Sequence, residues 1–309
     1  MNISQHFRLR ISFTLVSPGL YSLITMLLLI CCAFGVVAKK QNKNYPRAEI
    51  KVNYEYHHPF LQSDGEITER VFNYTLLANS YCSKYYNYNN EFLDSLDSTP
   101  QGRKLHNQLM TIGVDQYIKN GDDSAIPRRK GQLYVYKSLR DSVTTVYDTY
   151  GLGEQGYYNE LFKEIEWVLT DSTKNILGYE CVRADTDYHG RHWTAWFAPE
   201  IPLQDGPWKL CGLPGLILEA SDYTGQYSFI ATAIENCDQE MFPIYQPTRY
   251  DKMNRIDMLK AYAEYRKNAS SISRALIMNT PDGSKIDMEA PKQQKQNFTK
   301  LDFLETDYH

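Results

Sequence analysis

The chain has 309 residues, 42% of them hydrophobic and 23% charged, which is the composition of a globular protein with one large or two ordinary domains. A formal net charge of -4, without a basic stripe, argues against a nucleic-acid-binding protein. The 25 tyrosines favour β-strands, because aromatic side chains pack well on a sheet that has one face in water.

The N-terminus predicts an export signal. Arg8 and Arg10 precede an apolar run from Leu20 to Ala38, which ends in small residues before Lys39. This layout is typical of a secretory signal and predicts cleavage after Ala38, with residues 1–38 as signal peptide and 39–46 as linker. An uncleaved anchor is the alternative, because about 20 apolar residues can span a bilayer. We therefore expect an exported protein, periplasmic, outer-membrane-associated or secreted, that contacts the membrane only through this segment if it stays uncleaved.

Alternating hydrophobicity predicts strands along most of the remaining chain. Ile50, Val52, Tyr54 and Tyr56 would share one face of the first strand. Further strands are predicted at 71–77, 132–137, 143–150, 165–169, 179–184, 192–197, 216–220 and 226–234, the last two as a hairpin. Helices are predicted after the N-cap Thr99-Pro100 and after a capping box that begins at Thr248, and the polar stretch 270–298 as a hairpin or a mobile segment. No repeat is visible, so residues 47–309 are predicted to form one domain.

The Pro- and Gly-rich stretch from Pro199 to Gly215 predicts a shaped loop that enters a core strand. Pro214 has a fixed φ and Gly215 can adopt a positive φ, so the turn before the strand should be rigid. Of Leu216 and Ile217, one is expected to face the core. We interpret the loop first as a folding element and second as the rim of a ligand site. The candidate rim residues are Arg191, Trp196, Pro199, Glu200, Pro202, Asp205, Gly206, Pro207, Trp208, Gly212, Leu213, Pro214, Gly215, Leu216 and Ile217.

These motifs resemble the GLPGLI family, secreted or envelope proteins of Gram-negative bacteria with no established activity. The namesake motif is Gly212 to Ile217. The resemblance continues in Gly190-Arg191-His192-Trp193, in Asp205 to Trp208 and in the acidic close Leu304 to Tyr308, so it covers nearly all of the chain beyond the linker. It implies a single GLPGLI-type β domain over 47–309 and carries no catalytic residue with it.

Four cysteines remain after the signal, which in an exported chain predicts two disulfides with three connectivities. If Ser221 faces Gln226 across the hairpin, Cys211 lies beside Cys237, which leaves Cys82 with Cys181. Four buried free thiols are the alternative. A zinc site is disfavoured, because none of these cysteines has C-x-x-C spacing.

Three constellations could carry chemistry, and each has a simpler interpretation. His189 and His192, near Asp185 and Asp187, could hold a metal, but Gly190 favours a solvated hairpin tip. Cys211 with either histidine could act as nucleophile and base, but the predicted disulfide would remove the thiol. Asp205 and Glu200 could serve glycan chemistry, but Asp before Gly-Pro is ordinary turn chemistry. We therefore predict no catalytic residue, no metal and no cofactor.

Many strands and few helices predict a mainly β fold: a strongly curved antiparallel sheet, a half-barrel similar to periplasmic lipoprotein carriers, with one or two packed helices. The leading hypothesis is a non-enzymatic envelope protein that binds an apolar or extended ligand, such as a lipid or peptide, or another envelope protein. The alternatives are a hydrolase of envelope or dietary polymers and a structural surface protein. An aromatic-lined cavity would favour binding, convergent carboxylates or a His–carboxylate pair in a cleft would favour hydrolysis, and a filled interior would favour a structural role.

Overall fold

The computed structural model describes residues 45–61, 66–129, 131–161, 165–275, 278–279, 285–286 and 303–308. The chain divides into the units Met1–Asn44 and Tyr45–His309, and the architecture below belongs to the second unit. The predicted signal peptide 1–38 lies outside the described residues, as do the linker up to Asn44 and most of the polar stretch 270–298. Within the described part, no helix is long and apolar enough to cross a membrane.

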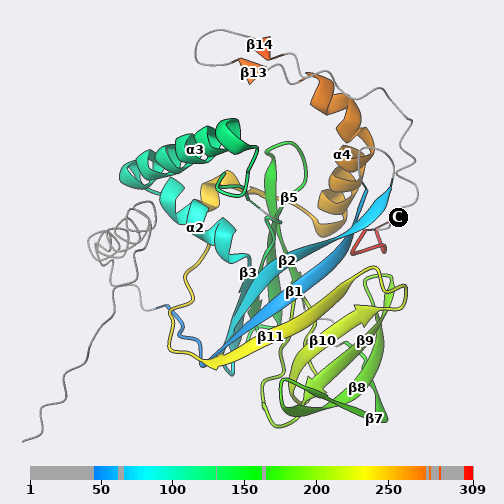
Figure 1. Cartoon of the computed structure of the whole chain (residues 1–309). Coiled ribbons are helices and arrows are strands. Elements are labelled where there is room, and N and C mark those ends of the chain that lie inside the picture. The colour runs from blue at the N-terminus through cyan, green and yellow to red at the C-terminus, as the bar shows by residue number, and fades with distance from the viewer. Residues whose placement is uncertain are drawn as a thin grey trace, which may run out of the picture. The chain divides into compact units, whose positions relative to one another are not determined.

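Twelve strands form one open sheet in the order β12-β6-β5-β4-β3-β2-β1-β11-β10-β9-β8-β7 (Figure 1). All neighbouring pairs are antiparallel except β12 with β6, which is parallel. The strands are β1 (Ile50–Leu61), β2 (Ile67–Ala78), β3 (Cys82–Tyr86), β4 (Tyr134–Ser138), β5 (Val143–Thr149), β6 (Gln155–Leu161), β7 (Val168–Ile176), β8 (Tyr179–Tyr188), β9 (Arg191–Ala198), β10 (Leu216–Asp222), β11 (Ser228–Asn236) and β12 (Asp251–Lys252).

The sheet curves around its core. Val146 of β5 and Trp193 of β9 are both buried in one hydrophobic cluster, although six strands lie between β5 and β9 in the sheet. Strands so far apart share a core only when the sheet bends around it. A mainly β fold with a strongly curved, open sheet is therefore confirmed. As predicted, Val52 and Tyr54 of β1 are buried on the inner face.

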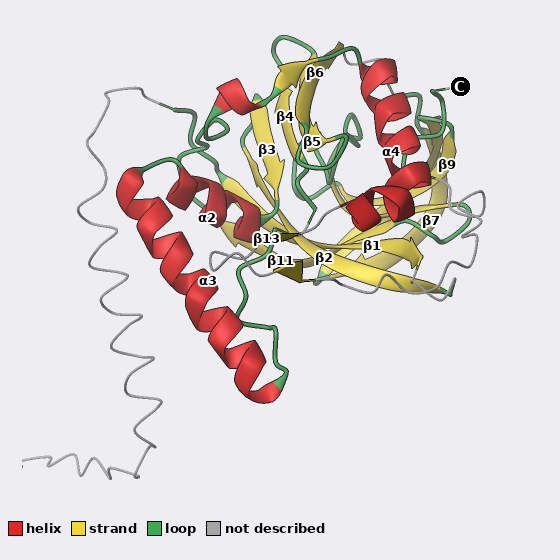
Figure 2. Cartoon of the chain, turned by 90° about the horizontal axis from the view of Figure 1, so that it is seen from above, coloured by secondary structure: helices red, strands yellow, loops and turns green. Residues whose placement is uncertain are grey.

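Among the described residues, three α-helices accompany the sheet: α2 (Tyr88–Asp97), α3 (Pro100–Asn120) and α4 (Arg255–Ala275). The predicted cap of α3 is confirmed, because Thr99 accepts a hydrogen bond from the Gly102 amide and Pro100 is the first helical residue. Figure 2 shows α2 against the sheet and α3 leading away from it.

The predicted start of the last helix is wrong. Residues Pro247–Arg249 form a 3-10 turn (η1), Asp251–Lys252 form β12, and α4 begins only at Arg255. Asn254 provides the local start signal, since its side chain accepts from the Ile256 amide. Farther on, β13 (Met278–Asn279) and β14 (Lys285–Ile286) pair as a separate two-stranded sheet.

Candidate functional site

The stretch 205–211 is a buried loop that fills the concave side of the sheet. All seven residues are buried. The Asp205 carboxylate pairs with the Lys137 ammonium of β4, and neither side chain is exposed. Lys137 also donates to the carbonyls of Gly206, at 2.8 Å, and Leu210, at 3.3 Å. A buried charge is tolerated only when it is paired and hydrogen-bonded, so this ion pair anchors the loop to the sheet.

The Gly-Leu-Pro-Gly turn has a different conformation from the one expected. Gly212, not Gly215, has the positive φ, at 91°. Gly215 is needed for another reason: a Cβ at this position would lie 2.3 Å from the Ala198 carbonyl oxygen. The expectation that only one of Leu216 and Ile217 faces the core is also wrong, since both are fully buried in the same hydrophobic cluster.

The candidate rim residues do not gather around a cavity. Pro199, Glu200, Pro202, Gly212 and Pro214 are exposed, and Trp196 is half-buried. The remaining candidates are buried: Arg191, Asp205, Gly206, Pro207, Trp208, Leu213, Gly215, Leu216 and Ile217. Of the whole set, Trp208 alone lines one of the two pockets described below. Its indole packs with Trp193 at a centroid distance of 5.7 Å, as a core residue does.

The predicted disulfides do not form: Cys82, Cys181, Cys211 and Cys237 are free. The register count failed because Ser221 pairs with Ser228 and not with Gln226. It also failed because β10 begins only at Leu216, which leaves Cys211 inside the buried loop.

Cys211 is held there by its backbone, since its carbonyl accepts from Trp167 Nε1 at 2.9 Å. Cys237 follows β11, where its amide donates to the Glu49 carbonyl. Burial raises the pKa of the Cys211 thiol to about 11, which makes it a poor nucleophile at neutral pH.

The β8–β9 hairpin tip separates the two histidines of the proposed metal site. His189 and Gly190 both have a positive φ, 51° and 78°, as a two-residue hairpin turn requires. His192 stays exposed and contacts Asp187 at 2.9 Å. The side chain of His189 is instead largely buried and lies apart from His192. The Asp185 carboxylate accepts hydrogen bonds from Arg183 and Thr194. A solvated tip is therefore confirmed for His192 but wrong for His189.

His189 belongs to an ionic cluster built from segments far apart in sequence. Its Nε2 lies 2.8 Å from Glu160 of β6, and its Nδ1 lies 2.8 Å from Arg255 of α4. Lys209 of the buried loop bridges Glu160, at 2.8 Å, and Glu305, at 2.7 Å. The cluster thus joins β6, the buried loop, α4 and the last described residues of the chain.

The carboxylates of this cluster stay ionised. Burial acts to raise the pKa of Glu160, but the His189 hydrogen bond and the Lys209 charge outweigh it and lower this pKa to about 2. Burial also acts to raise the pKa of Glu305 and of Asp307. At Glu305 the charge of Lys209 outweighs it, at Asp307 the hydrogen bond from Arg255 does so, and both carboxyls have a lowered pKa. Carboxylates paired in this way stabilise the folded state.

The same cluster contains atoms that could ligate a cation, because His189, Glu305 and Asp307 place one ligand atom each within 4.8 Å of one another. The ammonium of Lys209 and the guanidinium of Arg255 already neutralise these carboxylates. Both ring nitrogens of His189 also have partners. This arrangement is an ion-pair network that fixes the chain, and we do not assign a metal centre to it.

The network holds residues 303–308, here called the C-terminal strap, against the hairpin tip. The Thr306 amide donates to the His189 carbonyl at 3.0 Å, and Thr306 Oγ1 donates to the Gly190 carbonyl at 3.0 Å. Arg191 donates to the Phe303 carbonyl at 3.0 Å while pairing with Asp222 at 2.7 Å. The strap is thereby fixed on a surface formed by α4 and the hairpin.

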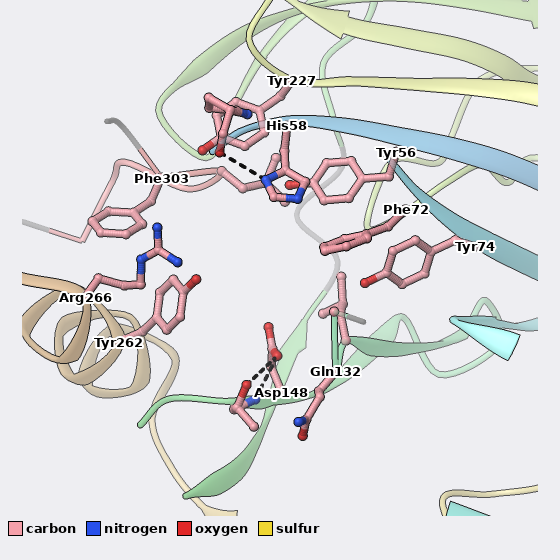
Figure 3. A pocket seen from close by; sticks show the side chains of 15 residues that line it. Tyr56, His58, Phe72, Tyr74, Gln132, Asp148, Tyr227, Tyr262, Arg266 and Phe303 are labelled. Atoms are coloured by element: carbon pink, nitrogen blue, oxygen red, sulfur yellow. Dashed lines mark hydrogen bonds between the residues drawn. The ribbon is translucent and has the colours of Figure 1, made fainter. Parts of the chain in front are cut away.

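Phe303 and Leu304 of the strap form one wall of a cavity of about 220 Å³, here called the aromatic pocket (Figure 3). A smaller cavity of about 100 Å³ shares several of its residues, among them Asp148, Tyr262 and Leu304. Six aromatic side chains line the larger cavity: Tyr56, Phe72, Tyr74, Tyr227, Tyr262 and Phe303.

Stacking in the core fixes the aromatic walls. The Tyr56 ring stacks on Phe229 at 4.8 Å, and Tyr74 stacks on Tyr85 at 4.7 Å, with interplanar angles of 13° and 4°. Burial raises the pKa of the Tyr56 and Tyr74 phenols, so both remain neutral. Rigid, neutral aromatic walls are suited to hold a planar or apolar part of a ligand.

The polar groups of the pocket come from three different elements. Burial raises the pKa of the Asp148 carboxyl of β5 to about 7, and the charge of Glu305 adds to this effect. Burial lowers the pKa of His58 of β1, with help from Arg70 and Arg266, so the imidazole is neutral at pH 7. Arg266 of α4 is the only arginine among the lining residues described.

Sequence reasoning missed this site. It placed Tyr56 on the inner face of its strand but did not single out Asp148 or Arg266. Both residues lie in ordinary surroundings in the sequence, and only the folded chain brings them together. The one feature of the sequence that pointed to the site was its high tyrosine content. It indicated which residue type could line a pocket but not where the pocket lies.

Residues 188–219 match the profile of a family described as "Protein of unknown function (Porph_ging)". The match spans the hairpin tip, the buried loop and the first part of β10. Two similar solved structures are described as "Structure of PNGF-II in P21 space group" and "Structure of PNGF-II in C2 space group". Their TM-scores are 0.43 and 0.44, with identities of 14% and 13%.

The matches cover 70% and 72% of this chain but 33% and 34% of those chains, so this chain spans about one third of their length. No curated protein matches the sequence.

Proposed function

We propose that this chain is an exported, non-enzymatic envelope protein of the GLPGLI type that binds a small ligand in the aromatic pocket. The observation that carries the proposal is the pocket itself: six aromatic side chains surround a cavity that also receives Asp148, His58 and Arg266. A concave, mainly aromatic site with a few convergent polar groups is the usual form of a ligand-binding site.

The volume of the pocket limits the size of the ligand that it can hold. A volume of about 220 Å³ suits a ligand of one ring and a few polar atoms, since sites for drug-sized ligands start at roughly 300 Å³. An extended lipid chain, which was one of the ligands expected from the sequence, would need a longer cavity. We therefore favour a compact ligand.

Binding is also better supported than hydrolysis. Asp148 is the one carboxylate among the described lining residues of the larger cavity. In the smaller cavity Glu305 joins it, but Glu305 is bound to Lys209 and Arg255. A glycosidase needs a second free carboxylate across the cleft, and no described residue of the pocket supplies one.

Native mass spectrometry of the protein purified from the envelope of a Gram-negative host tests the proposal. We expect a retained small molecule on the parent protein. It should be lost in Tyr262→Ala, which removes a wall of the pocket, and kept in Tyr265→Ala, which changes a tyrosine of α4 outside the pocket. A parent protein that never carries a ligand, or a ligand that stays bound to Tyr262→Ala, would contradict it.

The intact mass in the same experiment tests export. A mature protein that begins at Lys39 supports cleavage after Ala38. A mass that still includes the apolar run would show that the segment anchors the protein instead.

A further inference from the structure

The aromatic pocket has two opposite charges on different walls. Asp148 reaches it from the end of β5, and Arg266 reaches it from α4. Figure 3 shows Asp148 across the cavity from His58, with Arg266 at the side next to Tyr262 and Phe303. The two charged groups therefore face the same space from different directions.

Neither charge is neutralised by another described residue. Asp148 accepts hydrogen bonds from the amide and hydroxyl of Thr149, at 2.7 and 3.5 Å, and it forms no ion pair within the described part of the chain. Arg266 lies beside the Tyr262 phenol and likewise forms no ion pair there. A partly buried charge without an oppositely charged partner raises the free energy of the folded state, so binding of a ligand that pairs with both groups would be favourable.

We infer that the aromatic pocket binds a small zwitterion with a planar ring, namely an aromatic α-amino acid. Its ammonium would lie towards Asp148, its carboxylate towards Arg266, and its ring against the tyrosine walls. Arginine suits a carboxylate because its guanidinium can bind both oxygens, and tyrosine faces attract a cation. This inference rests on the proposed binding function and adds the chemical class of the ligand.

The titration of Asp148 gives the binding an expected pH dependence. An ammonium pairs only with the ionised carboxylate, so affinity should increase from pH 5 to pH 8. Glu305 stays ionised through this window, because its pairing with Lys209 outweighs burial and lowers its pKa. Burial lowers the pKa of His58, so its imidazole is neutral at the upper end of the window. The phenols close enough to interact with the Asp148 charge all have a pKa raised by burial, so they stay protonated in this window: Tyr56, Tyr74, Tyr158, Tyr250 and Tyr262.

Calorimetric titration of the mature protein with three probes tests the inference. The probes are L-phenylalanine, phenethylamine, which lacks the carboxylate, and 3-phenylpropanoate, which lacks the ammonium. We expect L-phenylalanine to bind at least tenfold more tightly than either analogue at pH 8. Asp148→Asn should weaken L-phenylalanine at least tenfold and leave 3-phenylpropanoate unchanged. Arg266→Gln should weaken L-phenylalanine and leave phenethylamine unchanged.

Lys260→Gln is the matched control, because it removes an exposed charge from the same helix. Equal binding of all three probes, or equal weakening of all three by both variants, would overturn the inference and leave the binding function standing. Absence of binding by every probe would also overturn it. In that case the search for a retained ligand by mass spectrometry would decide separately whether the pocket binds anything.

Discussion

The Asp148 carboxyl lies in the wall of an aromatic pocket, where burial raises its pKa from 3.8 to about 7. Ionising it at neutral pH disfavours the folded state, because the unfolded chain solvates the charge better. A residue that lowers stability at a pocket wall is typical of a functional site, where binding and stability make opposite demands.

Asp148→Asn should therefore stabilise the protein, and more so at high pH. Between about pH 4 and pH 7 the folded state keeps a proton that the unfolded state has lost, so the stability of the parent falls as pH rises through this window. The gain in the variant should increase from near zero at pH 4 to on the order of 2–4 kcal/mol at pH 8. Urea unfolding at both pH values measures it. Asp171→Asn, on the exposed strand β7, is the control, and a gain independent of pH would contradict the argument.

Two neighbouring residues of the namesake motif should be equally sensitive. Leu216 and Ile217 are both fully buried, and Gly206 of the buried loop packs so closely that a Cβ there would lie 2.8 Å from Ile217. Each substitution to Ala should cost about 2–5 kcal/mol of unfolding free energy. Gly215→Ala should also destabilise, since its Cβ would overlap the Ala198 carbonyl. Thermal melts of the three variants test this, and a tolerated Ile217→Ala would show that the loop does not seal that face.

The C-terminal strap is a short segment in which the apolar Phe303 and Leu304, which form a wall of the pocket, are followed by the acidic residues Glu305 and Asp307. Its side chains reach the hairpin tip, the buried loop and α4 through ion pairs and not through regular pairing with a strand. The attachment of the strap to the domain should therefore depend on pH more strongly than the pairing of the strands does.

Acid should weaken this attachment. The pKa of Glu160 lies at about 2, so its contribution to stability is present above about pH 4.5 and is lost as pH falls from there towards 2. Glu160→Gln should be less stable than the parent at pH 6 and should lose less stability on acidification. Urea unfolding from pH 6 to pH 2.5 measures both effects. Glu166→Gln, which changes an exposed residue just before β7, is the control. If Glu160→Gln lost as much stability between pH 6 and pH 2.5 as the parent, the stabilising role of the Glu160 carboxylate would be contradicted.

The folded domain owes its stability to the core and not to cross-links. The buried loop and the inner faces of the strands share one large hydrophobic cluster, a second cluster lies around Tyr86 and Tyr134, and Cys82, Cys181, Cys211 and Cys237 are free. A domain of this size can bury enough apolar surface to fold without disulfides.

Thiol chemistry tests this directly. Burial raises the pKa of Cys82, Cys181 and Cys211, so these three thiols should react slowly with iodoacetamide in the native protein. After unfolding without reductant, Cys82, Cys181, Cys211 and Cys237 should all be labelled. The melting temperature should be the same with and without dithiothreitol. Fewer labelled thiols, or a melting temperature lowered by the reductant, would show that the protein contains a disulfide.

Local patterns in the sequence determined the fold class and much of the local structure. The alternation at Val52 and Tyr54, the hairpin of the strands predicted at 216–220 and 226–234, and the cap Thr99-Pro100 depend on neighbouring residues. The structure confirms all three, although the register of the hairpin differs from the predicted one. Such features follow from side-chain periodicity and backbone preferences, which act over a few residues.

The site was decided only by the tertiary structure. Tyr56 meets Tyr262, and His189 meets Asp307, across long stretches of chain, and no local pattern specifies these neighbours. The same holds for the burial of 205–211, which removed part of the predicted ligand rim from the surface and separated Cys211 from Cys237. Curvature of the sheet and the packing of a loop inside it set which surfaces remain open, and these are properties of the whole chain.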